Sequence, residues 1–327
     1  MSLLATAAVS AGVGATLLWV LLRFAARRLP LDLPNARSLH ERPVPRIGGV
    51  AILGALTLVA AAGFAPFGLA LALAIALGAV SFVDDVRRLP TGVRLAAHLA
   101  ASAVLAWYIL SPMHPLELAL IVLAVAWITN LYNFMDGSDG LAGGMSIAGF
   151  GAYAIAASLA SDDGTALTAV AIVGASAAFL AFNFPPARVF LGDVGSIPLG
   201  FLAGALGITG WRNDAWPLWF PLLVFAPFIG DATITLVKRL LRRERVWQAH
   251  REHYYQRMVR MGLGHRRTAL VAYVLMALCA GAALYGRGEA PPVQAAVFAT
   301  TTALLAGVAI WVDLRWARYC RGTGTAA

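Results

Sequence analysis

The sequence predicts an all-α protein that crosses a membrane many times. Three observations carry this prediction: 60% of the 327 residues are hydrophobic, only 13% are charged, and the mean hydropathy is +0.76. A soluble domain carries about 25% charged residues, and here the deficit extends along the whole chain. The composition therefore favours a single integral membrane domain, residues 1–327, over a soluble enzyme held by one anchor.

Apolar stretches that can span about 30 Å of hydrocarbon can be drawn eleven times. The first has no basic segment before it and its arginines follow the apolar run, which predicts a retained helix rather than a cleaved signal peptide. The second and third are separated only by a turn at Gly63–Pro66 and should form a tight hairpin. The predicted spans are 3–22, 47–64, 66–83, 95–111, 115–131, 141–160, 165–184, 196–211, 216–237, 268–286 and 292–314.

The basic residues predict how these spans are oriented. If the first helix runs inward, 23 of the 25 lysines and arginines fall on one side, and only Arg212 and Arg287 fall on the other. Positive residues mark the cytoplasmic side, so we expect an N-out, C-in topology. The net charge of +9 then forms a cytoplasmic collar that attracts anionic membrane lipids, and no nucleic-acid partner is expected.

The same topology gathers five aspartates at the basic face. An acid at membrane depth usually has a partner or a task, because placing it there costs about 2.5–3.5 kcal/mol. Mg²⁺ commonly uses one or two carboxylates together with substrate phosphates. The loops 23–46, 84–94, 132–140, 183–195 and 238–267 are therefore expected to form an active site for a phosphorylated substrate and a divalent metal.

The first acidic motif is SFVDDVRRLP, residues 81–90. Asp84 and Asp85 repel one another, so a metal or a raised pKa could hold them together, and one of them could orient or deprotonate a phosphate nucleophile. The alternative is a hydrophilic helix end with local Asp–Arg pairs.

The second motif is NLYNFMDGSDGLAGG, residues 130–144. Asn133, Asp136 and Asp139 alternate with glycines, which permit a close backbone approach to a ligand, while the Asn and Asp side chains can bind a base or a metal. A plain Asn/Asp/Gly turn is the weaker alternative.

The third motif is FNFPPARVFLGDVGSIPLGF, residues 182–201. Asp193 stands where the next helix begins, an arrangement that suits a metal-bound diphosphate. Phe190 could stack on a nucleobase, or it could be an aromatic residue of the membrane interface.

The fourth motif is HREHYYQRM, residues 250–258. His250 and His253 have the spacing of a zinc pair, but no third ligand follows, so phosphate and sugar binding is favoured. A solvated basic helix at the membrane surface is the alternative. Asp231 could be a lipid-phosphate or metal-side residue or a structural acid, and His98 is expected to be structural. The pair Gly48–Gly49, in the same loop region as His40, could let a base or a phosphate approach the backbone.

These four motifs, in this order, resemble the polyprenyl-phosphate N-acetylhexosamine-1-phosphate transferases. The resemblance covers residues from about 37 to 258. It implies that Asp84 and Asp85 are the catalytic acid pair and that Asp193 binds Mg²⁺, with Mn²⁺ as an alternative. It also implies that the nucleotide, sugar and diphosphate are bound by the residues of three loops, namely Asn133, Asp136, Asp139, Phe190, His250, Arg251 and His253.

The resemblance implies a reaction as well. N-acetylhexosamine-1-phosphate would pass from a UDP-sugar to undecaprenyl phosphate on the cytoplasmic face, with release of UMP. Arg46 and Arg88 are predicted charge partners of the lipid phosphate. The branch that uses a muramoyl pentapeptide has adjacent histidines where this chain has HREHYYQR, and a lysine in place of Arg88. The departures favour an enzyme that initiates O-antigen or another surface polysaccharide, with UDP-N-acetylglucosamine or its fucosamine or quinovosamine relatives as donor.

Other classes remain as alternatives. A transporter or flippase would show internal repeats with helices broken near the midplane, and no such repeat is visible in the sequence. A CDP-alcohol phosphotransferase would carry a different aspartate signature, and a scaffold would tolerate loss of the aspartates. The sequence leaves the sugar, the polyprenyl length, the role of each acid of the pair and the choice between monomer and homodimer open.

Overall fold

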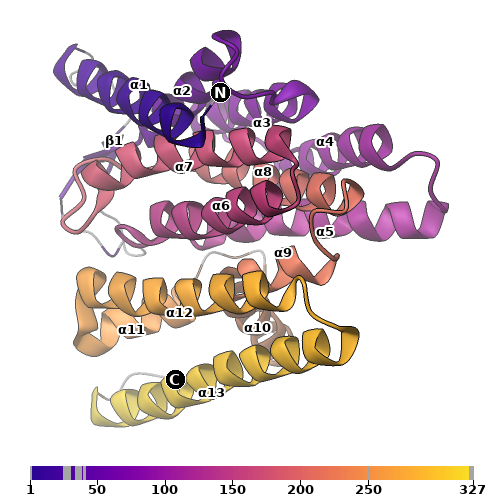
Figure 1. Cartoon of the computed structure of the whole chain (residues 1–327). Helices are drawn as coiled ribbons and strands as arrows, with labels where there is room; N and C mark the ends of the chain where they lie inside the picture. The colour runs from indigo at the N-terminus through magenta and orange to yellow at the C-terminus, as the bar shows by residue number, and fades with distance from the viewer. Residues whose placement is uncertain are drawn as a thin grey trace.

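The computed structural model describes residues 2–24, 31–33, 39, 42–246, 248 and 250–323. These residues form a helical bundle in which the long helices lie side by side, with the two chain ends at opposite edges (Figure 1). The helices are α1 (Leu3–Phe24), α2 (Gly48–Ala61), α3 (Gly68–Arg87), α4 (Thr91–Leu110), α5 (Pro115–Phe134), α6 (Leu141–Leu159), α7 (Asp163–Asn183), α8 (Asp193–Arg212), α9 (Trp219–Val224), α10 (Ala226–Leu241), α11 (Tyr254–Met258), the π-helical turn η1 (Val259–Leu263), α12 (Gly264–Gly286) and α13 (Pro291–Thr323).

The fold is that of a multi-pass membrane protein. Among the described residues, nine helices are long and apolar enough to cross a membrane. The all-α class predicted from the sequence is therefore confirmed. The bundle packs around one continuous buried core, and a second small cluster joins α11 to α13.

Two of the eleven predicted spans contain shorter helices than expected. In span 47–64, helix α2 has 14 residues, which gives about 21 Å at 1.5 Å per residue and falls short of the hydrocarbon thickness. Span 216–237 is broken into α9 and α10 around Phe225. Pro227 lies in the first turn of α10. A proline has no N–H and crowds the carbonyl four residues earlier, which favours the start of a new helix at this position.

Helix α8 lies at the centre of the bundle. In its apolar stretch 83% of the residues are buried, compared with 11% in α13. It packs against α3 on one side and α5 on another. Because α8 begins at Asp193, the centre of the bundle fixes the position of that carboxylate.

Two short strands connect the N-terminal loop to the beginning of α8. Strand β1 (Leu31–Asp32) pairs antiparallel with β2 (Val44–Pro45). The chain after β2 then runs beside Phe190 and Leu191, whose carbonyls accept hydrogen bonds from the backbone N–H groups of Gly48 and Gly49, both at 2.9 Å. This pairing brings the loop that carries Arg46 next to Asp193.

Gly48 and Gly49 have a packing role. A Cβ atom at Gly49 would lie 2.2 Å from the backbone nitrogen of Gly195, and one at Gly48 would lie 2.4 Å from the ring of Phe179. The glycine pair thus lets α2 approach α7 and α8 closely. The suggestion that it accompanies a base or phosphate remains a prediction, and His40 lies outside the described residues.

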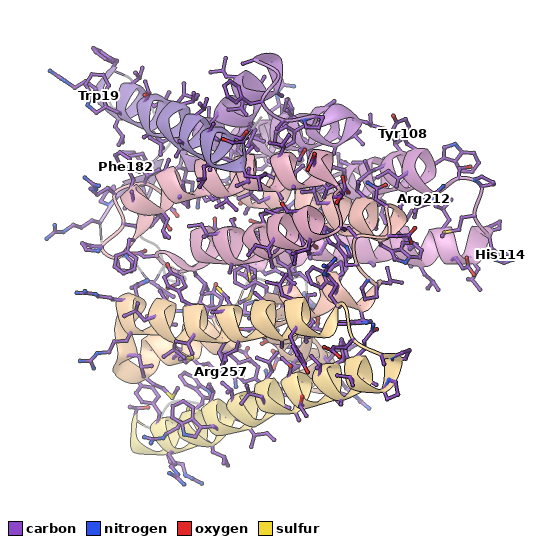
Figure 2. All side chains as sticks on the ribbon, in the orientation of Figure 1. Trp19, Tyr108, His114, Phe182, Arg212 and Arg257 are labelled. Atoms are coloured by element: carbon purple, nitrogen blue, oxygen red, sulfur yellow. The ribbon has the colours of Figure 1, made fainter. Side chains whose placement is uncertain are left out.

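The loops between helices meet at two ends of the bundle. Tyr108, His114 and Arg212 lie at one end and Phe182 at the other (Figure 2). The acidic motifs all belong to the Phe182 end, because α3, α5 and α7 finish there and α8 begins there. Asp313 of α13 also lies toward this end, where it accepts a hydrogen bond from Arg257 at 2.9 Å and pairs with Lys238, which ties the C-terminal helix to α10 and α11.

Candidate active site

A polar cavity of about 320 Å³ opens where α5, α7 and α8 meet. It contains six of the residues predicted from the sequence, which come from three separate segments of the chain. Its lining is Asp32, Leu39, Arg46, Asn133, Asp136, Gly137, Ser138, Asp139, Asn183, Phe190, Gly192, Asp193, Gln256 and His265. Four of these side chains are carboxylates and only one is an arginine, so the cavity is strongly acidic.

Asp193 is held by an amide at the end of α5. The side chain of Asn133 hydrogen-bonds to the Asp193 carboxylate, and its Oδ1 accepts a hydrogen bond from Ser196 Oγ at 2.7 Å. Ser196 is one turn further along α8 and also donates to the Gly192 carbonyl at 3.2 Å. Asn133 therefore fixes the end of α5 against the beginning of α8 and orients the aspartate.

Asp136 and Asp193 lie close enough to repel one another. Burial raises the pKa of Asp136 well above its ordinary value, and the negative charge of Asp193 raises it further, although Arg46 and a backbone N–H from Gly192 oppose the shift. Gly192 has a φ of +70°, a conformation that a residue with a Cβ rarely adopts. Two adjoining acids that resist ionisation together are an arrangement that a bound cation would stabilise.

Asp85 does not line the polar cavity itself, but it interacts with Arg46, which does. Arg46 lies 2.9 Å from Asp32 and 3.9 Å from Asp85. Burial opposes the charge on Arg46, but the hydrogen bond and the charge of Asp32 raise its pKa above the ordinary value. Arg46 therefore remains a cation among acids from β1, α3 and α8, where it can pair with an anionic substrate.

Asp84 has a different environment from its neighbour. Its carboxylate accepts a hydrogen bond from the backbone N–H of Leu89 at 2.6 Å and another from Arg94 Nη1 at 3.0 Å. Arg88, between them, ends α3 in the left-handed conformation with a φ of 52°. Asp84 thus holds the turn from α3 to α4, whereas Asp85 is directed toward Arg46.

Asp139 is fixed by a histidine that the sequence analysis missed. Its Oδ2 accepts a hydrogen bond from the backbone N–H of Ala187 at 2.9 Å, and its own backbone N–H donates to His265 Nδ1 at 3.3 Å. The other ring nitrogen of His265, Nε2, lies 3.1 Å from the Leu39 carbonyl, which can only accept a hydrogen bond. Nε2 is therefore the protonated nitrogen, and Nδ1 accepts from Ser138 Oγ at 2.9 Å. One imidazole joins three loops around the cavity.

A second cavity of about 460 Å³ adjoins the first. The two share Asn133 and Gln256. Its walls are mostly apolar, and none of the described residues that line it carries a carboxylate. The lining is Thr91, Arg94, Leu95, His98, Trp127, Asn130, Asn133, Phe134, Ile197, Leu236, Val246, Gln248, His250, His253 and Gln256. We call it the apolar cavity, and the first one the polar cavity.

His250 and His253 enter the apolar cavity together, with ring centroids 4.8 Å apart. Burial lowers the pKa of His250 to about 4, and His253 and Arg239 lower it as well, so its imidazole is neutral at pH 7. His250 Nδ1 accepts the backbone N–H of Glu252 at 3.3 Å, which leaves Nε2–H as a donor. His250 can therefore offer a hydrogen bond to a substrate but no charge.

The sequence left two roles open for Asp231, and its contacts are those of a structural acid. Its carboxylate accepts hydrogen bonds from His253 Nδ1 at 3.1 Å and from the backbone N–H groups of Tyr254 at 2.9 Å and Tyr255 at 3.0 Å. These contacts satisfy backbone donors in the first turn of α11 that have no partner within the helix. Asp231 thereby holds α11, and with it His253, at the edge of both cavities.

Two of the predicted binding residues lie outside both cavities. Arg88 is exposed at the end of α3. Arg251 is half-buried, and its carbonyl accepts a hydrogen bond from Arg260 at 3.1 Å. Their assignment to substrate binding remains a prediction.

Several lining residues of the two cavities were not singled out from the sequence, among them Asp32, Arg94, Gln256 and His265. They come from three separate parts of the chain that tertiary packing brings to these cavities. The signal that could have identified them in the sequence is their position near the recognised motifs, in loops on the basic face. Arg94 and His265 each follow an acidic or histidine motif by only a few residues.

The lining of the polar cavity fits a divalent cation. Among the described residues, no three His, Cys, Asp or Glu side chains converge as a metal-ligand cluster. Mg²⁺ differs from zinc in this respect, because it often takes one or two carboxylates and completes its shell with water and substrate phosphates. Asp193, with Asp136 nearby, provides such a pair in a cavity that carries an excess of negative charge.

The fold and site together define a multi-pass membrane protein with an acidic cavity at one end of its helices. A sequence model of glycosyl transferase family 4 matches residues 67–211. A probable undecaprenyl-phosphate N-acetylglucosaminyl 1-phosphate transferase of Bacillus subtilis is 28% identical over 77% of this chain and 76% of its own length. A decaprenyl-phosphate N-acetylglucosaminephosphotransferase of Mycolicibacterium smegmatis is 28% identical over 76% of this chain and 73% of its own length.

A third relative is named for a muramoyl-pentapeptide substrate. A phospho-N-acetylmuramoyl-pentapeptide-transferase of Shouchella clausii is 35% identical over 59% of this chain and 74% of its own length. The chain belongs to glycosyl transferase family 4, and the family resemblance read from its four motifs is confirmed.

Proposed function

We propose that this protein transfers an N-acetylhexosamine-1-phosphate group from a UDP-sugar to a polyprenyl phosphate and releases UMP. The observation that carries the proposal is the pairing of two adjoining cavities with opposite character. The polar cavity has four carboxylates around one arginine. The apolar cavity has mainly apolar walls and also contains Arg94 and three histidines. These linings match a metal-bound nucleotide diphosphate on one side and an anionic lipid on the other.

The shared wall is where the two substrates would meet. Asn133 and Gln256 line both cavities, so a lipid phosphate in one lies beside a sugar diphosphate in the other. An oxygen of the lipid phosphate attacks the phosphorus that carries the sugar, and the bond from that phosphorus to UMP breaks. Holding both groups in this geometry supplies a large part of the rate enhancement.

The chain's own residues have distinct tasks in this scheme. Asp193 and Asp136 hold Mg²⁺ (Mn²⁺ is the alternative), which when bound neutralises the charge of the donor diphosphate. Arg46 pairs with substrate phosphate, Asp85 orients or deprotonates the attacking group, and Phe190 with Asp139 binds the base. Direct attack is proposed over an aspartyl-phosphate intermediate, because a phosphate monoester is already an anionic nucleophile.

The finer assignments belong to the same proposal. The relatives named as N-acetylglucosaminyl 1-phosphate transferases support UDP-N-acetylglucosamine as donor, and a deoxy N-acetylhexosamine is the alternative. Undecaprenyl phosphate is the proposed acceptor. The positive charge at the site end of the bundle supports a cytoplasmic active site, an N-out, C-in orientation and a bacterial inner-membrane location. The proposed role is initiation of a lipid-linked surface glycan such as an O-antigen.

The test is release of UMP by purified protein in detergent, with Mg²⁺ and undecaprenyl phosphate, across a panel of UDP-N-acetylhexosamines. We expect release that depends on the lipid and is highest with one donor. UMP release without lipid would contradict direct attack. No release with any donor, from protein that elutes as a folded species, would overturn the proposed reaction.

A further inference from the structure

His98 has a buried ring nitrogen without a partner in the apolar cavity. The residue is only 4% exposed and lies in the middle of α4. Within the described part of the chain, Nδ1 has no hydrogen-bond partner, while the ring bonds to the side chain of Asn130. An unsatisfied buried polar atom costs about 1–3 kcal/mol, so its persistence at a cavity wall points to a ligand.

The orientation of the ring follows from its neighbour. Asn130 Nδ2 donates one of its two hydrogens to the Ala126 carbonyl at 2.9 Å, and its Oδ1 accepts a hydrogen bond from His98. Because Nδ1 is the unpartnered atom, Nε2–H is the donor to Asn130. The Nδ1 lone pair of His98 then belongs to the cavity that this residue lines.

A second unpartnered nitrogen stands one turn away on the same face of α4. Arg94 is four residues before His98, a spacing that places two side chains side by side on a helix. Arg94 Nη1 is held by Asp84 at 3.0 Å, but its Nε is buried and has no partner among the described residues. Both residues line the apolar cavity, so the two side chains that carry unpartnered buried nitrogens border the same space.

We propose that His98 and Arg94 bind the phosphate monoester of the lipid acceptor, an inference that rests on the proposed function. The ligand must be anionic, because Arg94 is a cation and no described residue of this cavity is a carboxylate. It must also supply a hydrogen-bond donor to the Nδ1 lone pair. The second ionisation of a phosphate monoester lies near pH 6, so its monoanion carries an O–H group that can donate to Nδ1.

The apolar walls explain why this phosphate would come from a lipid. Trp127, Phe134, Ile197 and Leu236 line the same cavity, and free phosphate has no apolar part that could cover these walls. A polyprenyl chain fills such walls favourably. Free phosphate should therefore compete only weakly with a prenyl phosphate for this site.

Two amide substitutions separate ligand binding from packing. The amide of glutamine can replace Nε2 and keep the bond to Asn130, whereas the shorter asparagine can replace Nδ1 and lose that bond. If His98 binds phosphate, His98→Gln raises the KM for the acceptor about tenfold or more, and His98→Asn raises it less. The KM for the UDP-sugar should stay the same in both variants. His114→Gln, at the far end of the bundle (Figure 2), is the matched control and should change neither value.

The measurements are acceptor and donor KM values, the apparent Tm of each variant, and direct calorimetric binding of a short-chain prenyl phosphate and of inorganic phosphate. A larger rise in the acceptor KM in His98→Asn than in His98→Gln would show a packing role and overturn the proposal. Equal rises in the acceptor KM and in the UDP-sugar KM would overturn it as well. If wild-type protein turns over no donor, the proposed reaction fails, and the calorimetry alone decides. Prenyl phosphate binding that His98→Gln weakens supports the site, and binding that it leaves unchanged refutes it.

Discussion

Asp231 Oδ1 accepts a hydrogen bond from His253 Nδ1 over 3.1 Å, and this contact crosses from α10 to the start of α11. Both side chains are buried, at 9% and 5% exposure. With Nδ1 committed to the carboxylate, the tautomer of a neutral His253 is fixed, and Nε2 remains for the apolar cavity. The same aspartate therefore sets both the place of α11 and the chemistry that His253 can offer.

Asp231→Asn should lower kcat about 10- to 100-fold, as expected for a lost hydrogen bond to a charged group worth about 1.5–3 kcal/mol. Asp231→Glu should recover part of the loss because it keeps an acceptor. The measurement is UMP release with saturating substrates. Asp163→Asn changes an exposed acid in the first turn of α7 and should be silent. Wild-type turnover in Asp231→Asn would show that the contact has no role in function.

The acid pair should separate into two roles. Asp84→Asn removes the negative charge and replaces one of the two oxygens that accept from Leu89 and Arg94, so it should lower the apparent Tm as well as the activity. Asp85→Asn should leave the Tm unchanged and abolish most of the turnover, because its carboxylate faces Arg46 and Asp193. The two measurements are the apparent Tm by differential scanning fluorimetry and UMP release, both on the same preparations. If Asp85→Asn were as unstable as Asp84→Asn, the division of roles would be incorrect.

The gathering of the acids could be predicted from the sequence, because it depends on the direction of helices alone. Once alternate spans are fixed, the ends of α3 and α5 and the beginning of α8 must lie at one face, and Asp85, Asp136 and Asp193 come with them. Pro227 also favours a break between α9 and α10, although Pro198 lies inside α8 without ending that helix. Treating that region as one span was the weaker interpretation.

What the sequence could not supply is the set of partners across long separations. Asp231 meets the N–H groups of residues more than twenty positions later, and His265 joins loops more than a hundred residues apart. Neither contact follows from periodicity or spacing. The pairing of Gly49 with the start of α8 is of the same kind, because a close approach of two backbones leaves no mark in one sequence beyond a glycine.

Gly49→Ala should prevent normal assembly of the bundle. Its Cβ would lie 2.2 Å from the Gly195 nitrogen and 2.4 Å from the Gly195 Cα, and backbone on both sides leaves nothing that can move aside cheaply. Overpacking of this kind costs about 1–3 kcal/mol or more. Gly12→Ala is the matched control, because no atom lies within 4 Å of a Cβ there. Size-exclusion profiles and apparent Tm should separate the two variants, and a normal profile for Gly49→Ala would contradict the packing assigned to it.

Removal of divalent cations should abolish turnover, since a cation offsets the charge of the acids around the polar cavity. Chelation with EDTA should stop UMP release, and Mg²⁺ should restore it. Asp193→Asn should lose most of kcat while remaining inserted in the membrane. Asp214→Asn, an acid beyond the other end of α8, should not alter the Mg²⁺ requirement. Full activity in EDTA, or in Asp193→Asn, would remove Asp193 from the metal site.

His250 should make the folded protein less stable in mild acid. Burial lowers its pKa from 6.5 to about 4, so between these values an unfolded chain binds a proton that the folded chain refuses. The stability that His250 contributes is therefore complete above pH 6.5 and is lost as the pH falls toward 4. Burial opposes the charge on Glu252, but Arg242 lowers its pKa, so Glu252 adds a similar loss of stability only below its ordinary pKa of 4.5.

Apparent Tm should fall between pH 7.5 and pH 5.0 in the wild type, and it should fall less in His250→Asn, which keeps an acceptor for the Glu252 backbone. Equal falls in the two proteins would mean that His250 titrates normally and carries charge into the apolar cavity at pH 5.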